Sequence, residues 1–235
     1  MGKIISLYGD DYYQKRADEF FTYAMEAIAK ENYEQAIDYF EQCYAFNSTN
    51  DEAYFYVGLV AYILNQFERA ITIFKDLHEK YPQNNEYAYR YARGLYERQE
   101  FSQSLSLFEK IQKDSEHYIQ SQFYIAKILH TEKKDAESIN TLISLMSHSS
   151  SADIRFELAS IYVEHNKLPA AINELKQCIE QEPTFAIAYY MLHDIYLDMR
   201  NEEQAISILK ELERVCPQEK EVIQQNIMMI RKKNN

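Results

Sequence analysis

The chain has 235 residues, of which 46% are apolar, and a formal net charge of −12 from 25 basic and 37 acidic side chains. This profile excludes a collagen, a disordered chain and a disulfide-rich miniprotein. Only 4 Gly and 4 Pro stand beside 21 Tyr and 12 Phe, which is too few turn formers for many short strands, so the composition predicts a mostly helical chain.

The N-terminal segment does not predict a secretory signal, and its match to the loose acylation pattern M-G-x-x-x-[ST] has poor specificity. It lacks the apolar core and the cleavage site of a secretory signal, and charges interrupt every later apolar run before it could span a bilayer. We therefore expect a cytoplasmic protein with no membrane partner. Asp10-Asp11 predicts a helix from Tyr12 onward. A short apolar segment precedes it, formed by Ile4, Ile5, Leu7 and Tyr8.

A small residue followed by an aliphatic one recurs six times along the chain with a nearly constant spacing. The pairs are Ala36-Ile37, Ala70-Ile71, Ser104-Leu105, Ser138-Ile139, Ala171-Ile172 and Ala205-Ile206. Apolar residues follow each small residue at offsets of four and seven, such as Phe108 and Ile111 in the third unit, which predicts one apolar face of a helix.

A second position, twelve residues upstream of each pair, is also small in most units. It is occupied by Ala24, Gly58, Ala92, Ala126, Ala159 and His193. Such a residue lets a second helix approach closely, so each period predicts a pair of helices. Pro82, Pro183 and Pro217 fall twelve residues after a pair, where they prevent the second helix from continuing.

This pattern resembles the tetratricopeptide repeat, whose units read W-x2-L-G-x2-Y, then A-x3-F, then P. The second unit matches well, with Tyr54-x2-Val57-Gly58-x2-Ala61, then Ala70-x3-Phe74, then Pro82. The third and fourth units match least, with Ser104 and Ser138 in place of the alanine.

The resemblance divides the chain into six repeats at 17–50, 51–84, 85–118, 119–151, 152–185 and 186–218, after an extension at 1–16. It implies an all-α solenoid, a right-handed superhelix whose first helices line the concave wall. Residues 219–235 are predicted to form a capping helix with Val222, Ile223, Ile227 and Ile230 on one face. Cys43, Cys178 and Cys216 have no partners at zinc-ligand spacing and are predicted to be reduced thiols in packed positions.

No combination of residues predicts catalysis. The phosphate-binding loop, the H-E-x-x-H zinc helix and the serine nucleophile elbow are all absent from the sequence. The six histidines are widely separated, and none has a histidine at the i,i+4 spacing of a helical metal site. His193 takes a close-packing position and is predicted to be buried. We expect no enzyme, no metal and no cofactor.

One face of the first helices carries an aromatic residue in all six repeats. These aromatics are Phe21, Phe55, Tyr89, Phe123, Phe156 and Tyr190. The same face continues with Met25, Ile28, Leu59, Tyr62, Arg93, Tyr96 and Lys127, and we call this whole set the first-helix stripe. It is rotated about 100° from the face that packs the helix pair, so it is predicted to face the groove. The aromatics either contact a partner there or pack neighbouring repeats together.

The side chains along the stripe are apolar at its beginning and basic in its middle. Arg90, Arg93 and Lys127 come from consecutive first helices and are predicted to converge on one anion. The acidic excess disfavours nucleic acid as a partner, because affinity for nucleic acid comes largely from basic side chains. A nucleic-acid or small-ligand sensor remains a minor alternative that depends on these three cations.

The stripe predicts a cytoplasmic adaptor that holds a peptide segment of another protein in its groove. Chaperone adaptors of the resembled family hold a carboxylate through Lys and Asn on the first two repeats, where this sequence has Phe21, Met25, Phe55 and Leu59. The resemblance therefore does not predict a chaperone tail as the ligand. The main alternative is a structural component that forms homo-oligomers through the apolar N-terminal segment and a last helix with Met228 and Met229.

Overall fold

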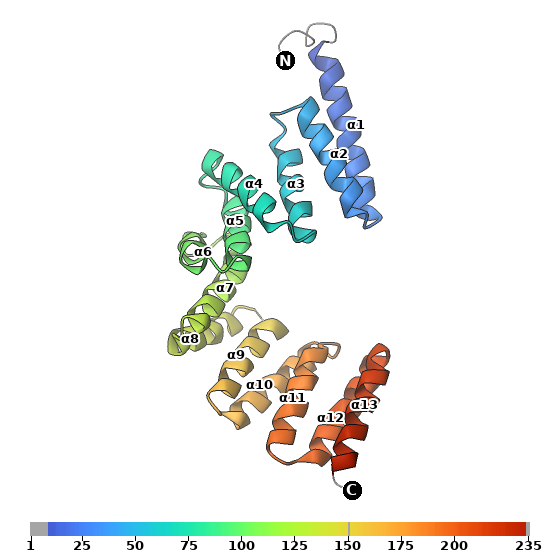
Figure 1. The fold of residues 1–235 in the computed structure, drawn as a ribbon. Coiled ribbons are helices and arrows are strands. Elements are labelled where there is room, and N and C mark those ends of the chain that lie inside the picture. The colour runs from blue at the N-terminus through green and yellow to red at the C-terminus, as the bar shows by residue number, and fades with distance from the viewer. Residues whose placement is uncertain (1–8, 150, 234–235) are drawn as a thin grey trace. The chain divides into compact units, whose positions relative to one another are not determined.

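The computed structural model describes residues 9–149 and 151–233, and within them the backbone forms thirteen α-helices and one 3₁₀ helix with no strand (Figure 1). None of the described helices combines the length and the apolar character that crossing a bilayer requires. The all-α solenoid class predicted from the sequence is confirmed.

The helices alternate along the chain as the first and second members of six pairs. The pairs are α1 (Asp10–Ala29) with α2 (Tyr33–Phe46), α3 (Asp51–Ile63) with α4 (Phe67–Lys80), α5 (Asn85–Glu97) with α6 (Phe101–Phe108), α7 (Tyr118–Thr131) with α8 (Asp135–Met146), α9 (Ala152–Glu164) with α10 (Leu168–Gln181), and α11 (Ala186–Asp198) with α12 (Glu202–Val215). The 3₁₀ helix η1 (Pro217–Glu219) and the helix α13 (Lys220–Lys233) follow.

The chain divides into two compact units, Met1–Ser121 and Gln122–Asn235. Within each unit, helices pack mainly against those next to them in the sequence, as α2 does against α1 and α3, and α11 against α10 and α12. This arrangement is typical of a repeat protein, in which each layer contacts only its neighbours. Each unit is described below by itself.

Small residues on the first helix of a pair let the second helix pack closely against it. The alanines 24, 92, 126 and 159 have no exposed surface, and a Cβ on Gly58 would lie 2.8 Å from the Phe74 ring. Where serine replaces alanine, its hydroxyl donates to a carbonyl of the paired helix, from Ser104 to Ala92 at 2.8 Å and from Ser138 to Ala126 at 2.7 Å. The two least regular repeats therefore keep the close approach and add a hydrogen bond.

His193 confirms its predicted burial, at 6% exposure, and its Nδ1 lies 3.3 Å from the Ala205 carbonyl oxygen of the paired helix. The three cysteines are free and buried. Burial raises the pKa of the Cys43 and Cys178 thiols to about 11, so both stay protonated at neutral pH.

Each helix pair is joined by the same kind of tight turn. In every turn one residue adopts a left-handed backbone with φ between 54° and 63°, and none of them is glycine: Glu31, Asn65, Gln99, Lys133, Asn166 and Arg200. In the third repeat the Gln99 N–H donates to the Tyr96 carbonyl, and the Glu100 N–H donates to the Leu95 carbonyl at 2.9 Å. This is the Schellman pattern, which satisfies the last carbonyls of a helix.

The prolines end second helices as predicted. The helices α4, α10 and α12 each stop two residues before Pro82, Pro183 or Pro217. The third repeat has no proline at the corresponding position. Its second helix, α6, ends at Phe108 and is the shortest of the described second helices. The predicted helical face extends one turn too far there, although Ile111 is still buried at 4% exposure. Its N–H donates to the Phe108 carbonyl, so a tight turn brings Ile111 back onto the core.

The last helix, α13, packs through Ile223, Ile227 and Ile230, which are all buried. Val222 was predicted to share this face, and that prediction is wrong because its side chain is 50% exposed. An offset of one residue on a helix is a rotation of about 100°, which turns Val222 away from α12. The apolar segment at residues 4–8, and the side chains of Lys232 and Lys233, lie outside the described residues.

Candidate functional site

In the first unit, the aromatics of the first-helix stripe pack toward the repeat that follows. The Phe21 ring on α1 meets Tyr56 on α3 edge to face, with centroids 5.7 Å apart, and the Phe55 ring on α3 lies 5.4 Å from Tyr87 on α5. These contacts hold consecutive first helices side by side. Phe21 and Phe55 therefore serve packing between repeats, whatever else they contact.

Tyr89 shows the packing role most fully, because its side chain is only 6% exposed. Its ring lies parallel to the imidazole of His117, with centroids 4.7 Å apart, and it also contacts Phe108. We predicted Tyr89 as a partner contact, but its burial leaves it little surface to offer.

The aliphatic members of the stripe on α1 and α3 remain accessible. Met25 is 39% exposed, and Ile28, Leu59 and Tyr62 are half-buried. Ile63, next to Tyr62, is 50% exposed. The contact between Phe21 and Tyr56 joins α1 to α3, so these accessible apolar side chains lie on neighbouring helices.

Further along the stripe, Tyr62 is tied to α5 through its hydroxyl. Arg93 donates to the Tyr62 oxygen at 3.0 Å and its guanidinium lies 4.6 Å from the centre of the Tyr62 ring. The Tyr62 hydroxyl donates to Glu97 at 2.7 Å. Tyr96, half-buried, packs against Phe101 with centroids 5.6 Å apart. Arg93 therefore already has an intramolecular role.

The other two predicted cations also have neighbours of their own. Arg90 donates to Glu86 Oε1 at 2.6 Å in the first unit. Lys127 belongs to the second unit, where its ammonium lies 5.6 Å from the centre of the Phe123 ring. The convergence of Arg90, Arg93 and Lys127 on one anion stays a prediction, because its members come from both units.

In the second unit, the stripe aromatics are half-buried, and Phe156 and Tyr190 pack forward along the chain. Phe156 meets Phe185, which precedes α11, with centroids 5.6 Å apart. Tyr190 donates to Glu219 of η1 at 3.0 Å. Burial, with help from this hydrogen bond to a carboxylate, raises the pKa of Tyr190 to about 12.

A network of histidines and carboxylates in the second unit was not predicted. Asp135, at the start of α8, lies 2.7 Å from His130 Nδ1 and 2.8 Å from His165 Nε2. Glu164 lies 3.2 Å from His130 Nε2. The two histidines hold the pKa of Asp135 below its usual value. Because the two histidines belong to different repeats, their positions give no local signal in the sequence.

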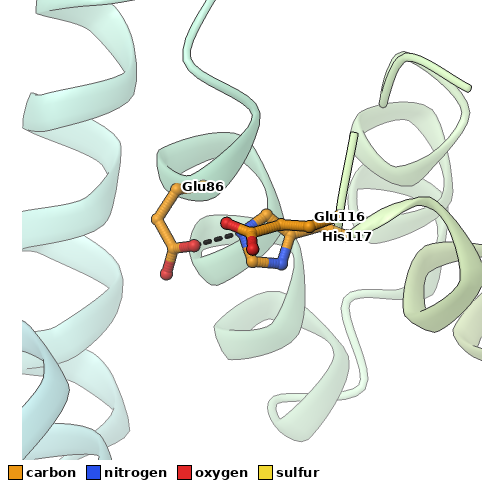
Figure 2. A group of neighbouring side chains, drawn as sticks. All are labelled: Glu86, Glu116 and His117. Carbon is orange, nitrogen blue, oxygen red and sulfur yellow. Dashed lines mark ion pairs between the residues drawn. The ribbon is translucent and has the colours of Figure 1, made fainter. Parts of the chain in front are cut away.

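One group of three side chains among the described residues could hold a metal ion, namely Glu86, Glu116 and His117. Figure 2 shows the Glu86 carboxylate pointing at the His117 imidazole, with the Glu116 carboxylate beside the ring. Their ligand atoms all lie within 4.8 Å of one another. Only the adjacency of Glu116 and His117 is visible in the sequence, since Glu86 lies about 30 residues earlier, in α5.

Two clefts in the surface lie away from the stripe aromatics. One, of about 430 Å³, is lined by residues of α2, α3 and α4 that include Tyr44, Tyr54 and Ile73. The other, of about 580 Å³, is lined by residues of α11, α12 and α13 that include Leu197 and Met229.

Comparisons with known proteins identify the repeats in two separate parts of the chain. Residues 29–111 match the family model of subunit 3 of the anaphase-promoting complex, or cyclosome, and residues 150–199 match the model of the TPR repeat. A search of curated proteins finds no match.

Among solved structures, the type IV pilus biogenesis factor PilW is similar in fold, with a TM-score of 0.73 and 16% identity over 86% of this chain and 94% of PilW. PilF of Pseudomonas aeruginosa gives 0.68 and 12% identity over 87% of this chain and 94% of PilF. YrrB, described as a TPR protein with an unusual peptide-binding site, gives 0.58 and 15% identity over 78% and 98% of the two chains. At these identities the likeness establishes the fold.

Proposed function

Because the chain is a tetratricopeptide repeat protein, we propose that it is a non-enzymatic scaffold that binds a peptide segment of a partner protein on the first-helix stripe of α1 and α3. The observation that supports this site is the accessible apolar surface formed by Met25, Ile28 and Leu59. Tetratricopeptide repeats are a protein-interaction fold, and the structurally similar YrrB is described as having a peptide-binding site.

The chemistry of this surface favours aliphatic or aromatic side chains on the partner. No charged residue belongs to the stripe on α1 or α3. The next stripe residue that is charged, Arg93 on α5, is linked to Glu97 through the Tyr62 hydroxyl. Affinity would come from burying methyl and methylene groups, at about 25 cal/mol per Å² of apolar surface removed from water. The proposal places the protein in the cytoplasm, where its free cysteines would remain reduced.

The proposal is tested by replacing Met25 with glutamate. Since Met25 is 39% exposed, the variant should fold normally. A charge placed where the partner buries apolar groups should weaken binding by about 2 kcal/mol or more. Partners would first be captured from the native organism and their binding peptides mapped, and affinity would then be measured by calorimetry.

The matched control is Met228→Glu, which places the same charge on an exposed methionine of α13. This variant should bind the peptide as the wild type does. Equal affinity for wild type and Met25→Glu would remove the α1 and α3 surface from the proposal. Phe55 and Tyr62 are less suitable probes, because each also packs against α5 and its loss would lower stability.

A second candidate function, self-assembly, is favoured by the exposed apolar residues of α13. Met228 and Met229 are each 58% exposed and Val222 is 50% exposed, all on this helix. Exposed apolar patches commonly mark protein–protein contact sites. Light scattering over a dilution series decides the matter, since a monomer at every concentration contradicts self-assembly.

A further inference from the structure

We infer that Glu86, Glu116 and His117 form a site for a divalent transition-metal ion, with zinc as the best fit, which would fasten the irregular segment 109–117 to the first turn of α5. The inference is independent of the proposed peptide surface. It depends on the positions of three donor atoms, on the groups that surround the His117 imidazole, and on the contacts that hold each ligand in place.

The donor atoms converge from two segments of the chain. Glu86 lies in the first turn of α5, and Glu116 and His117 immediately precede α7. The two carboxylates and the imidazole each offer one ligand atom, and all three atoms lie within 4.8 Å of one another. Donor atoms bound to one zinc ion at about 2.0 to 2.2 Å lie no more than about 4.4 Å apart, so the exposed Glu116 side chain would move slightly inward on binding.

The imidazole supplies the second observation. The Nε2 atom of His117 is buried and faces both carboxylates, since it lies against Glu86 Oε2 and 3.6 Å from Glu116 Oε1. The whole side chain is 13% exposed. An imidazole nitrogen and two carboxylates that converge on one point are ligands that zinc commonly binds in proteins.

Neighbouring groups already fix the orientation of two ligands. The His117 ring lies flat against the ring of Tyr89, with an interplanar angle of 6°. Its backbone N–H donates to the Ser115 hydroxyl at 3.2 Å. Arg90 donates to Glu86 Oε1, which leaves Oε2 on the side of His117. Metal ligands in proteins are commonly held by such outer hydrogen bonds.

The donor set selects the class of ion. One imidazole and two carboxylates with an open fourth position suit zinc, whereas calcium takes six to eight oxygen ligands and magnesium demands an octahedron of oxygens. Two carboxylates and the nearby Arg90 give the site a net charge of about −1, which still favours a cation. Glu116 is 85% exposed and completes the site from the solvent side.

The test is a zinc titration of the full chain, freed of any affinity tag and stripped with a chelator, followed by competition with a chromophoric chelator. The wild type should bind one zinc ion at this site. Glu116→Gln and His117→Asn should each weaken binding by more than about tenfold, which is the loss that even outer-sphere changes can produce. Millimolar calcium or magnesium should not displace the zinc.

His165→Asn is the matched control, because His165 belongs to the separate network around Asp135. This variant should bind zinc as the wild type does. Glu116→Gln changes an exposed side chain and should fold normally, so its loss of zinc affinity would not reflect misfolding. Zinc should also raise the melting temperature of the wild type and leave that of Glu116→Gln unchanged. Absence of binding to the wild type, or undiminished binding to His117→Asn, would overturn the site.

Discussion

At the scale of single residues, departures from the repeat pattern are compensated by specific contacts. Ser104 and Ser138 replace alanine and each donates to a carbonyl of the paired helix, while His193 replaces a small residue and approaches the Ala205 carbonyl. The sequence predicts that these positions are close-packed, because the period places them there. It does not predict the hydrogen bonds, since their acceptors are backbone atoms whose place depends on the helix crossing.

The left-handed turn residues are the clearest case of a feature with a weak sequence signal. Of the six, only Asn65 and Asn166 belong to a type that tolerates positive φ well. At the other four positions the side chain gives no indication of the backbone it adopts. The turn geometry follows instead from the need to satisfy helix-end carbonyls and reverse the chain within a short turn.

Replacing Gln99 with glycine should therefore stabilise the protein. Its φ is 62°, a region that costs an ordinary residue about 1 to 2 kcal/mol and glycine very little. Glycine also loses more entropy on folding, by about 0.4 to 1 kcal/mol, so we expect a net gain of about 0.5 kcal/mol in the free energy of unfolding. Urea denaturation measures it. Gln99→Ala, which keeps the Cβ, should give no gain, and a loss of stability in Gln99→Gly would contradict the explanation.

At the scale of helices, the repeat register can be predicted from the sequence better than the helix ends. Periodicity places the small residues and the prolines, and with them the two helices of each pair. The helix α6 ends at Phe108 without a proline, and the spacing that predicts a helix through Ile111 is met there by a tight turn instead. Burial of Ile111 was predictable, but its backbone conformation was not.

The first-helix stripe was partly predictable for the same reason. Helical spacing puts its members on one face, yet their contacts come from the next repeat, as in Phe55 with Tyr87 and Arg93 with Tyr62. Such pairs depend on how one repeat is rotated against the next. A single sequence therefore could not separate exposed Met25 from buried Tyr89, although they share the stripe.

Gly94 on α5 provides a test of packing between successive repeats. A Cβ at this position would lie 2.5 Å from Cγ1 of Ile71 on α4, which is far too close. Alanine would gain about 1 kcal/mol in helix propensity, but overpacking costs about 1 to 3 kcal/mol, so Gly94→Ala should lower the free energy of unfolding by about 1 kcal/mol.

A double-mutant cycle provides the control for Gly94. In an Ile71→Ala background the obstructing atom is gone, so the same Gly94→Ala change should become neutral or stabilising. Thermal or urea unfolding of the four proteins gives the coupling. If alanine at 94 were equally harmful in both backgrounds, the contact with Ile71 would not be its cause.

At the scale of the whole molecule, cohesion comes from contacts between successive layers. The network around Asp135 is one such tie, because it joins the α7 to α8 turn of the fourth repeat to His165 at the end of α9 in the fifth. Hydrogen bonds from the two histidines lower the pKa of Asp135 below its ordinary value of 3.8. The stabilisation that Asp135 contributes is therefore complete above that value and is lost as the pH falls through its lowered pKa.

The predicted consequence is a pH-dependent difference between the wild type and Asp135→Asn. The wild type should be the more stable protein at pH 5, and its advantage should shrink as the pH falls below about 4. Urea denaturation at pH 3 to 6 measures this. Asp114→Asn, a change to an exposed carboxylate in segment 109–117, serves as the comparison and should show no such trend. An advantage that persisted unchanged at pH 3 would contradict the role of the carboxylate.

The asparagine caps at the starts of α3 and α5 affect how the number of repeats can change in evolution. The Asn50 side chain accepts from the Ala53 N–H at the start of α3, and the Asn84 side chain accepts from two N–H groups at the start of α5. Excising residues 51–84 would bring Asn50 directly before Asn85, so the new junction would carry the cap that α5 already has. Recombination at this junction could therefore delete or duplicate the repeat 51–84, and the helix that follows the junction would still begin with an asparagine cap.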